Sequence, residues 1–179
     1  MMSKKLVIFI DSGDTLVDES TEIRNADGIV EKADLIFGAG ETIRFLTEQG
    51  HTVVLVADGE AKSFENIFRL HGIYDCFSSV ICSEKIGERK PSRKMFEAAM
   101  KSAGLSDGDK GRIIMVGNNL ERDVKGANEM GIISVFMDWS PRYPKTPSDL
   151  SETPNYIIHE PKELINLVSD LQEKINTGH

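Results

Sequence analysis

Several polar residues of this sequence follow directly after apolar runs or open the segment that comes next. In chain order they are Asp11, Asp58, Lys90, Asn118, Asn119 and Asp123. Carboxylate and carbonyl oxygens are the ligands that Mg²⁺ prefers, and a lysine offsets excess negative charge around a phosphoryl group. If the fold brings these residues together, we expect a site for a divalent cation and a phosphate.

Apolar runs and helical patterns alternate along the chain, and this alternation predicts how the polar residues are positioned. The predicted strands are Leu6–Ile10, Thr52–Val56, Ser79–Cys82, Ile113–Val116, Ile133–Phe136 and, from a weaker pattern, Tyr156–Ile158. The predicted helices are Glu41–Gln49, Ala61–His71, Pro91–Met100, Asp123–Met130 and Lys162–Ile175. Continuous apolar strands that alternate with helices are typical of a doubly wound α/β fold with a parallel sheet. Ligands bind beyond the carboxyl ends of such strands, which is where the polar residues lie.

Two segments depart from this alternation. Residues 16–36 alternate loosely around Asn25-Ala26-Asp27-Gly28, a tight-turn sequence, and therefore predict a β-hairpin directly after the first strand. The Pro-rich stretch Pro141 to Pro154 predicts an irregular loop and not a domain linker, because the residues after it are too few to form a core. We expect one domain over residues 1–179.

Composition limits the classes of partner. The chain of 179 residues has a formal charge of −8, which argues against non-specific binding to nucleic acid or anionic membranes. Cys76 and Cys82 match no zinc or redox pattern and suggest thiols in a reducing compartment. The apolar run after Lys5 is too short for a signal peptide or a membrane span. We expect a cytoplasmic protein.

Three stretches of the sequence resemble motifs of the haloacid dehalogenase superfamily over roughly residues 5–165. Phe9-Ile10-Asp11-Ser12-Gly13-Asp14-Thr15-Leu16 stands in place of the first motif, an apolar strand followed by Asp-x-Asp-Gly-Thr-Leu. Lys90-Pro91, followed by a helix with Phe96, resembles the third motif. Val116-Gly117-Asn118, Asp123, Gly126-Ala127 and Gly131 resemble the fourth. The hairpin after the first strand resembles the flap of this family.

The resemblance implies a mechanism of phosphoryl transfer. Asp11 would attack a phosphoryl group to give an aspartyl-phosphate that water then hydrolyses, and Lys90 would steady both groups. The Mg²⁺ cofactor would be held by Asp11, the Gly13 carbonyl, Asn118 and Asp123. The residues expected to bind the substrate are Gly13, Ala57, Asp58, Asn119 and Arg142.

The sequence departs from the family pattern at three positions. Gly13 replaces the second Asp of the first motif, the usual general acid and base. Ala57 replaces a Ser or Thr that binds phosphate, and Asn118 replaces the first Asp of the fourth motif. Loss of a general acid typically costs on the order of 10²–10⁴ in rate. The neighbouring Asp14 is one candidate substitute.

The sequence leaves no room for a cap domain. The stretches 16–56 and 58–89 are already occupied by the predicted hairpin, helices and strand. An open site favours a macromolecular substrate, a sugar phosphate covered by a loop, or a homodimer in which the neighbouring subunit serves as the lid. The loop Asp138–Lys145 should lie on the same rim, where it either contacts the leaving group or a partner, or packs on the body as a surface loop.

Three functions are compatible with these observations. The first is a Mg²⁺-dependent phosphatase that acts on a phosphomonoester. The second is a catalytically weak or silent protein that binds a phospho-ligand or a protein partner, which Gly13, Ala57 and Asn118 all favour. The third is hydrolysis of a different bond, carbon–halogen or carbon–phosphorus. Dehalogenation should need no metal, while the carbon–phosphorus branch of the family uses a cap lysine that this sequence lacks.

Overall fold

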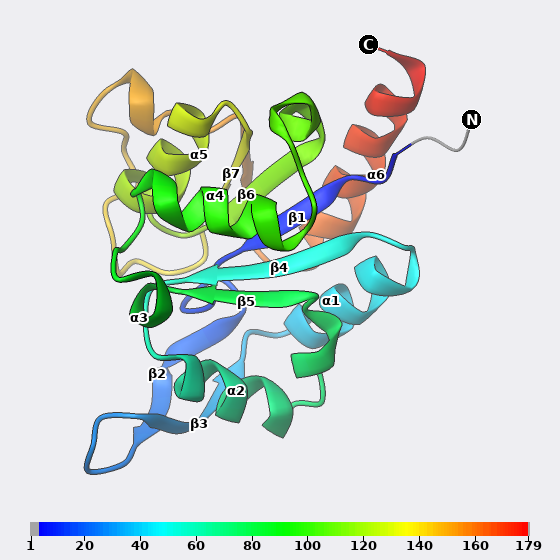
Figure 1. Cartoon of the computed structure of the whole chain (residues 1–179). Coiled ribbons are helices and arrows are strands. Elements are labelled where there is room, and N and C mark those ends of the chain that lie inside the picture. Colours follow the sequence, from blue (N-terminus) through cyan, green and yellow to red (C-terminus); the bar gives the residue numbers. More distant parts are fainter. Residues whose placement is uncertain (1–3, 179) are drawn as a thin grey trace.

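A six-stranded parallel sheet forms the centre of the computed structural model, which describes residues 4–178 (Figure 1). The strands lie in the order β5-β4-β1-β6-β7-β8, so that β1 and β6 are neighbours at the centre. Their bounds are Val7–Ile10 (β1), Thr52–Ala57 (β4), Ser79–Cys82 (β5), Ile113–Gly117 (β6), Ile133–Met137 (β7) and Tyr156–Ile158 (β8). The predicted doubly wound fold and its strands are confirmed. The ends of the predicted domain, residues 1–3 and 179, lie outside the described residues.

Helices cover both faces of the sheet. They are α1 (Ala39–Glu48), α2 (Ala61–Leu70), α3 (Ser83–Ile86), α4 (Arg93–Ser102), α5 (Lys125–Met130) and α6 (Glu163–Thr177). Successive side chains of a strand point to opposite faces. Ile8 and Ile10 of β1 therefore pack in the core that includes α1 and α6, while Val7 and Phe9 pack in the core that includes α4 and α5. Because β1 is buried on both faces, the residue at its end, Asp11, is firmly placed.

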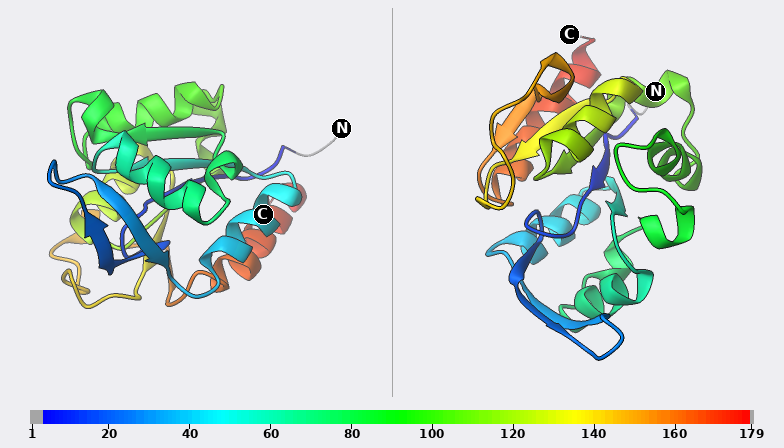
Figure 2. Two further views of the ribbon diagram at one scale, coloured as in Figure 1. Left: turned by 90° about the horizontal axis from the view of Figure 1, so that it is seen from below. Right: turned by 90° about the vertical axis from the view of Figure 1, so that its left-hand side faces the viewer.

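An antiparallel hairpin, β2 (Val17–Arg24) and β3 (Val30–Leu35), stands apart from the sheet and packs beside α2 (Figure 2). The N–H of Val30 donates to Ser63 Oγ at 3.0 Å, and Asn66 Nδ2 donates to the Val30 carbonyl at 2.9 Å. The predicted hairpin is confirmed. Its contacts with α2 fix it beside the carboxyl end of the sheet.

Several predicted helix boundaries differ from the structure by one or two residues, and two of these differences lie next to the candidate site. The helix predicted from Pro91 begins at Arg93, because Ser92 caps it and accepts the N–H of Lys94 at 3.3 Å. The helix predicted from Asp123 begins at Lys125, because Asp123 belongs to a π-helical turn, η3 (Leu120–Val124), that turns it toward the sheet.

Short 3-10 helices at Tyr74–Cys76, Asp107–Arg112 and Leu150–Glu152 were not predicted, and the last of these interrupts the expected irregular loop. Within residues 4–178, no helix has the length and apolar character needed to cross a membrane.

Close packing between α4 and α5 leads to a test of the fold. A Cβ on Gly126 would lie 2.4 Å from Phe96 Cε2, and the Phe96 ring is fully buried. We expect Gly126→Ala to lower the free energy of unfolding by about 1–3 kcal/mol, the usual cost of overpacking, despite the better helix propensity of alanine. Urea unfolding measures the change. Gly111→Ala, where a Cβ would meet nothing within 4 Å, is the control, and equal stability of the two variants would contradict this account.

Candidate active site

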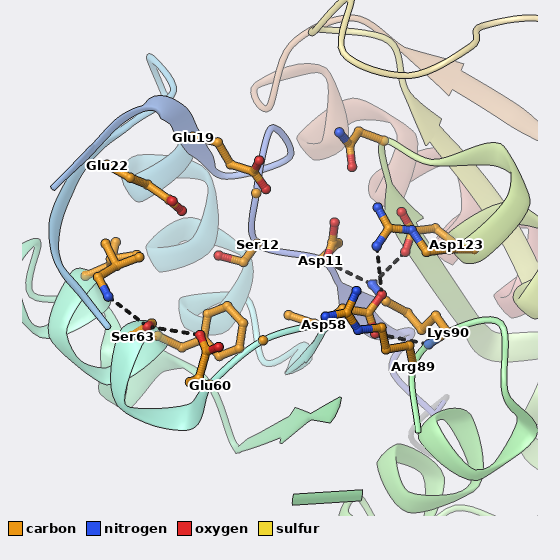
Figure 3. Close-up of a pocket in the computed structure, with 18 of the residues that line it drawn as sticks. Asp11, Ser12, Glu19, Glu22, Asp58, Glu60, Ser63, Arg89, Lys90 and Asp123 are labelled. Carbon is orange, nitrogen blue, oxygen red and sulfur yellow. Dashed lines mark hydrogen bonds and ion pairs between the residues drawn. The ribbon is translucent and has the colours of Figure 1, made fainter. Parts of the chain in front are cut away.

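The ammonium group of Lys90 connects the ends of three chain segments. Its Nζ donates to Asp11 Oδ1 at 2.9 Å and to Asp123 Oδ1 at 2.6 Å (Figure 3). It also donates to the Val56 carbonyl at 2.8 Å. An ammonium group has three hydrogens, and these three acceptors match them. Asp11 follows β1, Val56 lies in β4 and Asp123 lies in η3 after β6. The predicted grouping of Asp11, Lys90 and Asp123 is therefore what the structure shows.

Burial and charge act against one another at this cluster. Burial alone lowers the pKa of Lys90, but Asp11, Asp123 and Asp58 outweigh it and raise the pKa above its ordinary value. The pKa of Asp123 is raised by burial, which outweighs the opposing effect of Lys90. Lys90 therefore stays protonated at neutral pH and serves as the counter-ion of the two carboxylates.

Asp58 supports this cluster from the loop after β4. Its Oδ1 accepts a hydrogen bond from the backbone N–H of Lys90 at 3.0 Å, and its Oδ2 accepts one from Arg122 Nη1 at 3.3 Å. The Arg122 guanidinium lies over the Tyr143 ring, 5.0 Å from its centroid. Asp58 thus fixes both Lys90 and a second cation, Arg122, at the rim of the site.

The side chains of Asp11 and Asn118 and the backbone carbonyl of Gly13 bring their oxygen atoms close together. The Asn118 amide lies 3.3 Å from both Asp11 Oδ2 and the Gly13 carbonyl oxygen. With its NH₂ turned inward the amide donates to both oxygens, and with its Oδ1 turned inward the three oxygens face one another, as ligands around a cation do. Residues 4–178 contain no cluster of three His, Cys, Asp or Glu side chains with metal-binding geometry, because two of these donors are an amide and a backbone carbonyl. The donor set nevertheless fits Mg²⁺, which accepts such oxygens.

These residues line a polar cavity at the carboxyl end of the sheet (Figure 3). Its carboxylates belong to Asp11, Glu19, Glu22, Asp58, Glu60 and Asp123. Its cations belong to Arg24, Arg89, Lys90 and Arg122. Since the carboxylates outnumber the cations, a divalent cation would reduce the repulsion that a phosphate meets on entering.

The turn after β1 brings a further carboxylate, Glu19, into the cavity. The Ser12 carbonyl accepts N–H groups from Thr15, Leu16 and Val17 at 3.2, 2.8 and 3.0 Å, which folds the chain back on itself. The turn places Asp14 in a left-handed conformation, φ 50°, which Asp tolerates. Burial raises the pKa of Glu19, and Asp14 raises it further. Sequence reasoning missed Glu19, whose only signal is its place on the hairpin strand that follows the first motif.

Other predicted site residues divide into two groups. Gly13, Ala57 and Asn118 line the cavity as expected. Asn119 and Arg142 do not appear among its lining residues. Asn119 caps η3, where its Oδ1 accepts the N–H of Arg122 at 3.0 Å.

The loop Asp138–Lys145 does reach the rim of the site. Tyr143 lines the cavity, while Arg142 forms ion pairs with Asp14 and Glu19 instead of facing the cavity. Asp14 is buried, and its two oxygens accept the Glu19 N–H at 3.1 Å and Arg142 Nε at 2.5 Å. This arrangement does not support Asp14 as the substitute acid.

Comparison with known proteins agrees with this geometry. A model of the haloacid dehalogenase-like hydrolases matches residues 5–131. A glyceraldehyde 3-phosphate phosphatase of Methanopyrus kandleri is 32% identical over 131 residues, which cover 73% of this chain and 54% of the relative. The chain thus matches about half the length of that relative.

Two solved structures share the fold. An uncharacterised protein of Listeria monocytogenes has a TM-score of 0.76 at 18% identity, covering 94% of this chain and 99% of the other. The putative hydrolase YfnB of Bacillus subtilis, bound to magnesium, has a TM-score of 0.73 at 16% identity, with coverage of 92% and 99%.

The buried ion pairs predict a large effect of removing Lys90. We expect Lys90→Met to lower the free energy of unfolding by about 3–5 kcal/mol, because it leaves Asp11 and Asp123 without a counter-ion. Urea unfolding measures the loss. Adding Asp123→Asn should recover part of it by removing one of the two unpaired charges. Lys94→Met, at an exposed lysine, is the control, and an equally small change in both lysine variants would contradict the account.

Proposed function

Since the chain belongs to the haloacid dehalogenase-like hydrolases, we propose that it is a Mg²⁺-dependent phosphatase that hydrolyses a phosphomonoester through an aspartyl-phosphate on Asp11. The observation that carries this proposal is the position of Asp11 at the cavity. One of its oxygens accepts Lys90, and the other lies 3.3 Å from the Asn118 amide.

The Asp11 carboxylate is suited to act as the nucleophile. Its hydrogen bond to Lys90 limits rotation, and the cavity gives it access to a ligand. In the first step, an Asp11 oxygen forms a bond to phosphorus while the bond from phosphorus to the leaving oxygen breaks, and that oxygen takes up a proton. In the second step, water attacks phosphorus, gives up a proton and releases inorganic phosphate and the Asp11 carboxylate.

Asp11, the Gly13 carbonyl, Asn118 and Asp123 would hold Mg²⁺ in this proposal. When bound, the ion supplies positive charge against the phosphoryl oxygens. The excess of carboxylates around the cavity and the convergence of oxygens on Asn118 support it. Lys90 supplies the remaining positive charge beside the transferring group.

A phosphorylated small molecule is the substrate class that we propose. The relative from M. kandleri is named a glyceraldehyde 3-phosphate phosphatase, and another relative, from Halopiger xanaduensis, a ribulose-1,5-bisphosphate 5-phosphatase. In this chain, Arg24, Arg89 and Arg122 line the cavity and offer donors to a polar or anionic leaving group. A cytoplasmic location, the absence of a cap and a homodimer stay predictions.

One observation favours the alternative, a protein that binds a phospho-ligand without turnover. Ala57 places a methyl group where the family carries a hydroxyl that binds phosphate. Turnover therefore separates the two functions.

Hydrolysis of 4-nitrophenyl phosphate with and without Mg²⁺ tests the proposal. We expect turnover only with the metal, and a loss of at least ~10³-fold in Asp11→Asn, because the amide is a poor nucleophile. Asp27→Asn makes the same change at an exposed residue of the hairpin turn and should behave as the parent. Folded protein with no turnover above the Asp11→Asn level would favour the binding role, and metal-independent turnover would contradict the proposed cofactor.

A further inference from the structure

The side chain of Glu19 fills the space beside Gly13. A Cβ built on Gly13 would lie 1.7 Å from Glu19 Oε1 and 2.5 Å from Glu19 Cδ. The backbone at Gly13 does not have a positive φ, so conformation alone does not require glycine here. The Glu19 carboxyl group occupies the space into which a side chain at position 13 would extend.

The hairpin holds this carboxyl group in place. The backbone N–H of Glu19 donates to Asp14 Oδ1 at 3.1 Å, which fixes the start of β2 over the turn. Arg142 Nε lies 3.2 Å from Glu19 Oε2 and also pairs with Asp14. Within residues 4–178, Oε1 has no hydrogen-bond partner, and it is the oxygen that faces Gly13. Glu19 therefore has one oxygen anchored and the other available to a ligand.

Glu19 and the nucleophile share one cavity. Both side chains line it, and Figure 3 shows Glu19 extending from the hairpin in the direction of Asp11. A short path joins them: Glu19 contacts Gly13, the Gly13 carbonyl lies 3.3 Å from the Asn118 amide, and that amide lies 3.3 Å from Asp11 Oδ2. Glu19 therefore lies beside the turn that follows Asp11, and both carboxyl groups line the cavity that a phosphoryl group would enter.

We propose that Glu19 is the general acid and base of this enzyme, and that it supplies from β2 the carboxyl group that position 13 lacks. This inference rests on the phosphatase function proposed above. In the first step, protonated Glu19 gives its proton to the leaving oxygen as the phosphorus–oxygen bond breaks. In the second step, the Glu19 carboxylate takes a proton from the attacking water, which restores the starting state.

The same arrangement gives Arg142 and Asp14 a role. Arg142 holds one oxygen of Glu19, and Asp14 holds its backbone, so both are positioning residues that act through Glu19. The predicted contact of Arg142 with the substrate is replaced in this proposal by an indirect effect.

Two substrates with different leaving groups test the proposal. Glu19→Gln keeps the shape of the side chain but cannot donate or accept the proton. With β-glycerol phosphate, an alkyl ester with a poor leaving group, kcat/KM should fall on the order of 10²–10⁴-fold. With 4-nitrophenyl phosphate, whose leaving group needs little protonation, the loss should be much smaller. Glu31→Gln, at an exposed residue of β3, is the matched control.

Moving the carboxyl group from position 19 to position 13 tests whether Glu19 has a catalytic role or only a structural one. Gly13→Asp alone places a second carboxyl group against Glu19, so one of the two side chains must move aside. Glu19→Ala removes the acid and clears the space, and the double variant Gly13→Asp/Glu19→Ala should recover alkyl phosphate hydrolysis relative to Glu19→Ala. A folded double variant with no more activity than Glu19→Ala would contradict the proposal.

These experiments separate the role of Glu19 from the proposed phosphatase function. If turnover needs Asp11 but Glu19→Gln changes kcat/KM by the same small factor with both substrates, the role of Glu19 is overturned. The proposed phosphatase function is unaffected by that result. A folded parent with no turnover of either ester would overturn both.

Discussion

The buried ammonium group of Lys90 is the interaction on which the site depends. It joins the end of β1, β4 and η3 through three hydrogen bonds, and removing it would leave Asp123 unpaired in the interior and Asp11 unpaired at the cavity. Buried ion pairs contribute little net stability compared with apolar packing, so their presence here is better explained by the need to orient Asp11 at the cavity. Gly126 and Phe96, packed together beside Pro91, keep the chain around Lys90 close to η3.

Negative charge is the second constraint, and it connects parts of the chain that are far apart in sequence. Six carboxylates line the cavity, and the cations around it come from the hairpin, the segment before α4 and η3. Arg142, from the loop after β7, pairs with Asp14 and Glu19. The loop and the hairpin therefore stabilise one another, and together they place Glu19 beside Gly13.

The central elements were predictable because their signals are local. Continuous apolar runs ending in polar residues predict parallel strands, and parallel strands bring their carboxyl ends to one edge. That reasoning was sufficient to group Asp11, Lys90 and Asp123. Glu19 was not predictable in this way, because its position depends on the left-handed turn at Asp14 and on irregular pairing in the hairpin. The indirect role of Arg142 and the capping role of Asn119 likewise depend on tertiary contacts that spacing does not reveal.

The central claim is that Asp11 carries the phosphoryl group during turnover. The direct measurement is mass analysis of the protein after acid quenching in the presence of 4-nitrophenyl phosphate and Mg²⁺, followed by proteolysis. The account predicts an added phosphoryl group on the peptide that contains Asp11, and no such addition in Asp11→Asn. Steady turnover with this peptide unmodified, or with the phosphoryl group on another residue, would contradict it.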